Sequence, residues 1–127
     1  MTQVATTDEL IQRKCAACEG GLPPCSPELA REQLAHLGDW KLDESGKSIR
    51  RGLRFRNFLQ AIDALNRIAE LAEQEQHHPD LHLTSYRVLT IVLTTHAVSG
   101  LSENDFILAA KIDRLIGTSF ADAKPNP

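Results

Sequence analysis

The sequence predicts an α+β domain in which a mostly antiparallel, four-stranded sheet carries helices packed on one face. Two observations favour this class. Apolar residues at helical spacing precede residue 77 and recur after residue 102, whereas short runs rich in β-branched residues lie before and between these segments. Strands grouped between helices, without regular strand–helix alternation, are typical of helices segregated to one side of an antiparallel sheet.

A helix and a hairpin open the predicted domain. The pair Ser26-Pro27 indicates a helix start, with serine as N-cap and proline at the first helical position, and this helix is expected to end near Leu37. Two strands at residues 40–43 and 49–55 then flank a polar turn, which predicts a β-hairpin.

A long central helix is predicted from its N-cap, Asn57, to about residue 76. One apolar stripe runs along it, formed by Phe58, Ile62, Leu65, Ala69 and Ala72. Pro79 cannot continue the helix and disfavours helical backbone at the residue before it. We therefore expect His77 and His78 to point in different directions from the helix end.

Two strands and a helix complete the predicted fold, at about residues 82–86, 88–96 and 103–118. The strand 88–96 is rich in β-branched residues and nearly free of charge. Three of its side chains are expected to face the helices: Leu89, Ile91 and Leu93. Side chains alternate along a strand, so His96 is expected on the opposite, Thr-rich face at the strand's last position.

Three histidines give the strongest indication of function. Unperturbed histidine has a pKa of roughly 6.5, so it can both give and accept a proton near neutral pH. His77 and His78 follow the central helix, and His96 closes a strand, which are positions where functional sites are built. Each is individually compatible with a structural role at a solvated helix end or in the core. Together they indicate proton transfer.

The spacing of these residues resembles that of the pterin-4a-carbinolamine dehydratase family. The matching positions are Glu73, His77-His78-Pro79, Tyr86, His96 and Asp105. The segment around Trp40 and the stretch from residue 95 to 105 are similar as well, so the resemblance covers about residues 27–117. It implies the α+β fold described above.

The resemblance also implies a reaction, 4a-hydroxytetrahydropterin dehydration to quinonoid dihydropterin. One proton is delivered to the departing hydroxyl and another is removed from N5. His77, His78 and His96 are expected in the site, with His77 and His96 as proton carriers and His78 as an orienting group. Which imidazole is the acid stays open, as does the pterin side chain. No cofactor is expected.

Further residues are expected at the substrate by resemblance: Glu73, Gln76, Thr94, Thr95 and Ala97. The backbone of the last three is expected to contact the pterin ring, whose polar edge suits backbone donors and acceptors. Glu73 lies one helical turn before His77 and could hold its imidazolium, although it is equally compatible with a solvated charge.

Asp105 is expected to support the site rather than to react. It occupies the third helical position after Ser102, which looks like an N-cap. This arrangement resembles a capping box, in which the two side chains satisfy free backbone donors at the helix start. A structural role is therefore favoured for Asp105.

A metal site is the main alternative in this region. His78 and His82 are four residues apart, a spacing that makes a ligand pair on a helix, and His77 and His96 could complete the set. Pro79 breaks the helical turn between the first two. We therefore expect no metal.

The chain contains three cysteines, Cys15, Cys18 and Cys25. An odd number argues against a disulfide framework, and a CxxC pair plus one falls short of a four-ligand zinc site unless His36 joins. With no signal peptide, the chain is expected to be cytoplasmic, where thiols stay reduced. The role of these cysteines stays open.

The expected organisation is a mobile N-terminal arm at residues 1–26, a domain at 27–118 and a flexible tail at 119–127. The arm is polar and broken by glycine and proline pairs, and the last four residues carry nothing apolar. At 127 residues with 42% hydrophobic content, the chain can bury one core.

Composition and resemblance also limit the partners. A formal charge of −3 and the absence of a basic cluster argue against nucleic-acid binding, and no apolar run reaches the roughly 18 residues of a membrane span. The family resembled here forms dimers and tetramers, so a homodimer or homotetramer is expected. A functional link to an aromatic amino acid hydroxylase is implied, because that enzyme uses the pterin cofactor that is recycled.

Two other functions are compatible with the resemblance. Animal members of the family bind a transcription factor, so a non-catalytic dimerisation or interaction module is one alternative. A related pterin role, beside molybdopterin synthesis, is the other. The complete histidine set favours catalysis.

Overall fold

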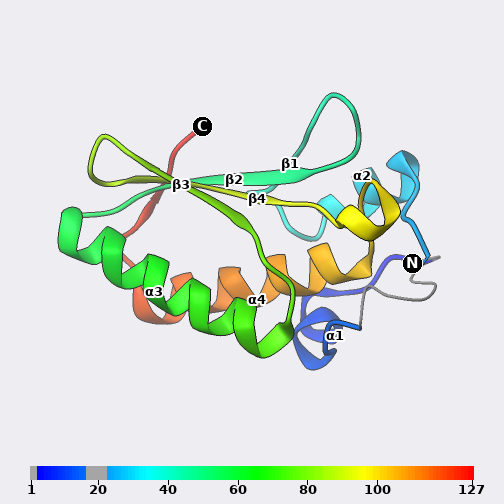
Figure 1. Cartoon of the computed structure of the whole chain (residues 1–127), viewed down its shortest axis with the longest axis horizontal. Coiled ribbons are helices and arrows are strands. Elements are labelled where there is room, and N and C mark those ends of the chain that lie inside the picture. Colours follow the sequence, from blue (N-terminus) through cyan, green and yellow to red (C-terminus); the bar gives the residue numbers. More distant parts are fainter. Residues whose placement is uncertain (1–2, 17–22) are drawn as a thin grey trace.

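The computed structural model describes residues 3–16 and 23–127 of the chain. Its two layers are a sheet and, beneath it, the helices α3 (Phe58–Glu75) and α4 (Glu103–Ser119) (Figure 1). Both long helices cover the same face of the sheet. The predicted α+β class, with helices on one side of an antiparallel sheet, is confirmed.

The sheet is antiparallel throughout, with the strand order β1-β2-β4-β3. Its strands are β1 (Lys41–Leu42), β2 (Ile49–Arg54), β3 (Asp80–Thr84) and β4 (Val88–Leu93). A fifth, two-residue strand, β5 (Lys124–Pro125), pairs with β2 beyond the predicted four. Three β4 side chains are fully buried toward the helices, as their alternation predicted: Leu89, Ile91 and Leu93.

Several boundaries differ from the prediction. β4 ends at Leu93, and His96 begins the 3-10 helix η1 (His96–Val98), because Thr95 and Gly100 hydrogen-bond to each other and close a tight loop. His96 is therefore not the last residue of a strand. Helix α2 (Pro27–Leu34) also stops before the expected residue 37, although its predicted N-cap, Ser26, accepts a hydrogen bond from the backbone of Leu29.

The described part of the arm packs on the domain, and the mobility expected for this segment stays a prediction. Residues 7–12 form helix α1 (Thr7–Gln12), which contacts α4, and its Leu10 is fully buried. The apolar side chains of the arm that join the core are Ala5 and Leu10, with Ile11 and Cys15 partly buried against it, and the polar composition of the segment did not indicate this packing. Of the expected tail, Phe120 is buried with its ring edge on Phe55, and β5 joins the sheet.

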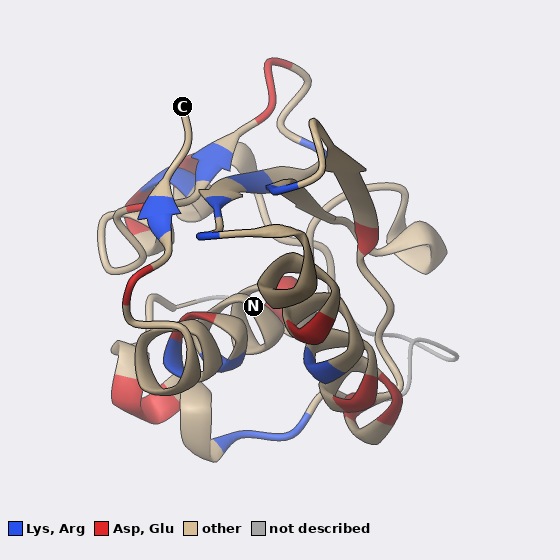
Figure 2. Ribbon diagram, turned by 90° about the vertical axis from the view of Figure 1, so that its left-hand side faces the viewer, with Lys and Arg blue, Asp and Glu red and all other residues tan. Residues whose placement is uncertain are grey.

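The open face of the sheet gathers basic side chains that are separated in the sequence. Lys41 lies opposite Arg50, and Arg54 lies opposite Lys124, and all four side chains are exposed. Figure 2 shows Lys and Arg on the strands of the sheet. These residues form a cluster only through cross-strand pairing, so the order of the sequence does not reveal it. The absence of nucleic-acid binding stays a prediction. In the described part of the chain, no helix has the length and apolar content needed to cross a membrane.

Candidate active site

The centre of the site is a buried pair formed by His77 and Asp105. Helix α3 ends at Glu75, and the left-handed backbone of its C-cap, Gln76 (φ 52°, ψ 38°), redirects the chain. His77 then turns inward and is only 5% exposed, and its Nε2 lies 2.6 Å from Oδ1 of the fully buried Asp105. A histidine at the end of one helix is thereby fixed by a carboxylate in the first turn of another.

The second oxygen of Asp105 binds two further groups. Its Oδ2 accepts hydrogen bonds from the Thr95 hydroxyl at 2.7 Å and from the Ser102 backbone N–H at 3.0 Å. The contact with Ser102 is part of a capping box, as the sequence predicted. The carboxylate therefore joins three segments: the end of α3, the loop after β4 and the start of α4.

His78 and Glu73 form a second, exposed pair. Nε2 of His78 lies 2.6 Å from Oε2 of Glu73. The prediction that Glu73 could hold His77 was wrong, because the left-handed turn at Gln76 sends His77 into the interior and leaves His78 beside the helix. Both side chains are well exposed, so the contact orients His78 but adds little stability.

The remaining expected residues, apart from Gln76, lie on the loop that follows β4. His96 and Ala97 are exposed in η1, and their neighbour Thr95 is bound to Asp105. The backbone N–H of Thr95 donates to the carbonyl of Gly100 at 2.8 Å, so this donor is already used within the chain.

The Thr94 hydroxyl is also used within the chain, since it donates to the carbonyl of Lys47 at 2.6 Å. Gln76 is exposed beside His77.

Three grooves on the described surface lie apart from the three histidines, although one of them, about 650 Å³ along α3, includes Glu73. One of about 530 Å³ lies between α3 and α4 and includes Arg67, Glu70 and Arg114, and a smaller one of about 210 Å³ lies on the open face of the sheet. None of the three histidines lines either groove. The site is placed at His77 because, in the described residues, its imidazole contacts the fully buried carboxylate of Asp105.

Metal-binding geometry is not found in the described residues. Across residues 3–16 and 23–127, no group of three or more His, Cys, Asp or Glu side chains could hold a metal ion. Cys18 of the CxxC pair lies outside these ranges, so the expectation of no metal stays a prediction.

Cys15 lies beside the site on the arm. Burial, together with the nearby negative charge of Glu75, raises the pKa of its thiol to about 12. At pH 8 such a thiol is ionised to roughly one part in 10⁴, against roughly a quarter for a free thiol of pKa about 8.5. We expect iodoacetamide to alkylate Cys15 at least about 100-fold more slowly in the native chain than in guanidinium. Peptide mass spectrometry measures each cysteine separately, and equal native and denatured rates at Cys15 would contradict this environment.

The fold and the site together define a class: a small α+β protein with a carboxylate-held buried histidine and further exposed histidines, suited to moving protons. Comparison with known proteins gives the family. Residues 23–115 match the family model described as pterin 4 alpha carbinolamine dehydratase. The chain belongs to the pterin-4a-carbinolamine dehydratase family, as the spacing of its histidines predicted.

Individual relatives agree with this assignment. A protein of Halorhodospira halophila named "Putative pterin-4-alpha-carbinolamine dehydratase" is 42% identical over 106 residues, covering 84% of this chain and 96% of the relative. A Rickettsia canadensis protein of the same name is 44% identical over 108 residues, covering 84% and 97%.

Solved structures share the fold. The crystal structure of a transcriptional coactivator/pterin dehydratase from Brucella melitensis has a TM-score of 0.68 at 26% identity and covers 73% of this chain and 98% of that one. A pterin dehydratase-like protein identified as a RuBisCO assembly factor in the alpha-carboxysome has a TM-score of 0.54 at 21% identity, covering 62% and 90%. At 21% identity, the similarity to this second structure shows only a shared fold.

Proposed function

We propose that this chain eliminates water from 4a-hydroxytetrahydropterin to give quinonoid dihydropterin, by histidine acid–base catalysis. One observation carries the proposal. Asp105 binds both the buried His77 and Thr95, the residue before His96, so the two distant stretches of chain that carry these histidines meet at one carboxylate. This reaction is a step in recycling the tetrahydropterin cofactor of aromatic amino acid hydroxylation.

The reaction needs two proton transfers, and we assign them to imidazole groups. The C4a–O bond breaks as one proton reaches the hydroxyl, and the N5–C4a double bond forms as N5 loses its proton. Asp105 forms a hydrogen bond with Nε2 of His77, which fixes the tautomer and the orientation of the imidazole. The other ring nitrogen, Nδ1, is then the atom that exchanges a proton. His96, exposed on η1, is the second proton carrier, and His78, held by Glu73, orients the substrate. Each positioned acid or base contributes typically about 10²–10⁴-fold.

A direct assay tests the function. Synthetic 4a-hydroxytetrahydropterin is followed by its absorbance as it loses water, with and without the purified protein and with and without EDTA. We expect the protein to accelerate dehydration over the spontaneous rate and EDTA to leave the rate unchanged. A protein that does not accelerate the reaction would favour the non-catalytic interaction module, and sensitivity to EDTA would exclude a metal-free site.

We also propose that the chain works as a homodimer or homotetramer. β3 lies at the end of the strand order, with β4 as its neighbour on one side. An edge strand exposes unpaired backbone groups that a second copy can satisfy. Sedimentation equilibrium tests the proposal, and a monomer at micromolar concentration would contradict it.

A further inference from the structure

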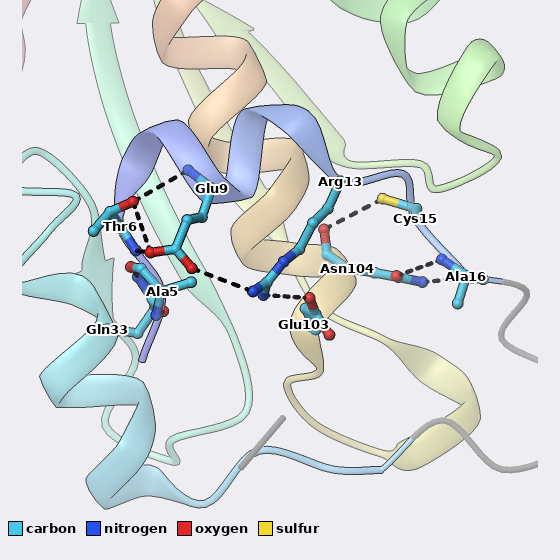
Figure 3. A network of polar contacts seen from close by, with 9 residues as sticks. All are labelled: Ala5, Thr6, Glu9, Arg13, Cys15, Ala16, Gln33, Glu103 and Asn104. Atoms are coloured by element: carbon cyan, nitrogen blue, oxygen red, sulfur yellow. Dashed lines mark hydrogen bonds and ion pairs between the residues drawn. The ribbon is translucent and has the colours of Figure 1, made fainter. Parts of the chain in front are cut away.

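The described arm, residues 3–16, is fastened to the domain by two buried amide side chains, although it precedes the family-matched residues 23–115. Gln33, fully buried on α2, accepts from the backbone N–H of Ala5 at 2.8 Å and donates to its carbonyl at 2.9 Å. Asn104, 1% exposed on α4, accepts from the N–H of Ala16 at 2.9 Å and donates to its carbonyl at 2.8 Å. Figure 3 shows both contacts. The arm thus has two chemically equivalent clamps.

The clamp at Asn104 lies directly beside the proposed active site. Asn104 precedes Asp105 in the chain, and the neighbouring arm residue Cys15 donates its backbone N–H to Oε1 of Glu75 at 2.9 Å. Glu75, 8% exposed, stands two residues before His77 and also accepts from Nζ of Lys111 at 2.8 Å. The arm therefore holds the residues that flank both members of the His77–Asp105 pair.

Two charged arm residues also contact the ends of these two helices. Arg13 lies 2.7 Å from Oε1 of Glu103 in the first turn of α4, as Figure 3 shows, and Lys14 donates to the carbonyl of Gln74 in the last turn of α3 at 2.8 Å. Every residue from 13 to 16 thus contacts one of the two helix ends. Residues 13–16 therefore link the end of α3 to the start of α4, the same two helix ends that the His77–Asp105 hydrogen bond links.

We infer that residues 13–16 of the arm position the His77–Asp105 pair, with Asn104 as the positioning residue that transmits their docking. A hydrogen bond between two helix ends depends on the separation of those ends, and catalytic groups must be held to within about 0.5 Å of their working geometry. In this inference Asn104 acts through its neighbour Asp105. The kinetic part of this inference rests on the proposed dehydration.

The two amide clamps provide a matched test. Asn104→Ala and Gln33→Ala each remove two hydrogen bonds between a buried amide and the arm backbone, but only Asn104 is adjacent in the chain to a member of the His77–Asp105 pair. We expect Asn104→Ala to lower kcat about 10- to 100-fold with little change in KM, because a small misplacement of catalytic groups costs this much. Gln33→Ala is expected to lose stability while its kcat stays within about twofold of the native value.

A second measurement does not depend on activity. The downfield NMR signal of the His77 Nε2–H proton, assigned with the variant His77→Gln, reports the hydrogen bond to Asp105. We expect Asn104→Ala to shift or broaden this signal and Gln33→Ala to leave it in place. If the native protein does not dehydrate the pterin, the proposed function fails, and the NMR comparison still decides the role of the arm.

A variant on the arm itself covers the case in which Asn104→Ala does not fold. Ala16→Pro removes the N–H that Asn104 accepts and leaves the sequence of α4 intact. It is expected to reproduce the kcat loss and the altered His77 signal. A native signal together with native kcat in this variant, or equal effects from the two amide variants, would overturn the inference.

Discussion

His96→Ala is expected to lower kcat/KM for 4a-hydroxytetrahydropterin by about 10²–10⁴-fold, the usual contribution of one positioned acid or base. Its side chain is exposed on η1, so truncation removes no core packing. We therefore expect the free energy of unfolding to change by no more than about 0.5 kcal/mol. Stopped-flow absorbance gives the rate, and urea unfolding gives the stability.

His82→Ala is the matched control for this variant. His82 is also an exposed histidine, but it lies on the open face of β3, with Thr90 opposite on β4. It is expected to keep native kcat/KM and native stability. If His96→Ala were as active as His82→Ala, the second proton carrier would have to be another group, with His78 the first to examine.

Much of the scaffold could be predicted because it depends on local patterns. Asn57 caps α3 with a hydrogen bond from the backbone of Gln60 at 2.9 Å, and Ser26 caps α2, as the sequence indicated. The alternation of β4 correctly predicted which side chains face the helices, since strand parity leaves only two choices. These features need no knowledge of distant contacts.

The pairings inside the site could not be predicted in this way. His77 and Asp105 are 28 residues apart, and spacing alone does not reveal that a capping carboxylate also binds a histidine. Helical periodicity placed Glu73 beside His77, but the left-handed backbone at Gln76, a conformation more usual for glycine or asparagine, changed its partner to His78. Leu10, the buried residue of α1, lay within a segment too polar to indicate packing.

His77→Ala is expected to have a double effect, because it removes a proton carrier and also isolates a buried charge. Asp105 is fully buried, and without His77 its carboxylate keeps only the neutral donors of Thr95 and Ser102. Removing the partner of a buried carboxylate costs about 3–5 kcal/mol. We expect this loss of stability together with a decrease in kcat/KM of about 10²–10⁴-fold, measured by urea unfolding and by the dehydration assay.

The double variant His77→Ala/Asp105→Asn separates these two effects. An asparagine at 105 is neutral and can still accept from the Ser102 N–H, so the uncompensated charge disappears while the capping contact remains. The double variant should therefore be more stable than His77→Ala alone and equally inactive. If activity returned together with stability, the loss in His77→Ala would reflect misfolding, and His77 would be structural. If stability did not improve, the unpartnered side chain at 105 would not be the cause of the instability of His77→Ala.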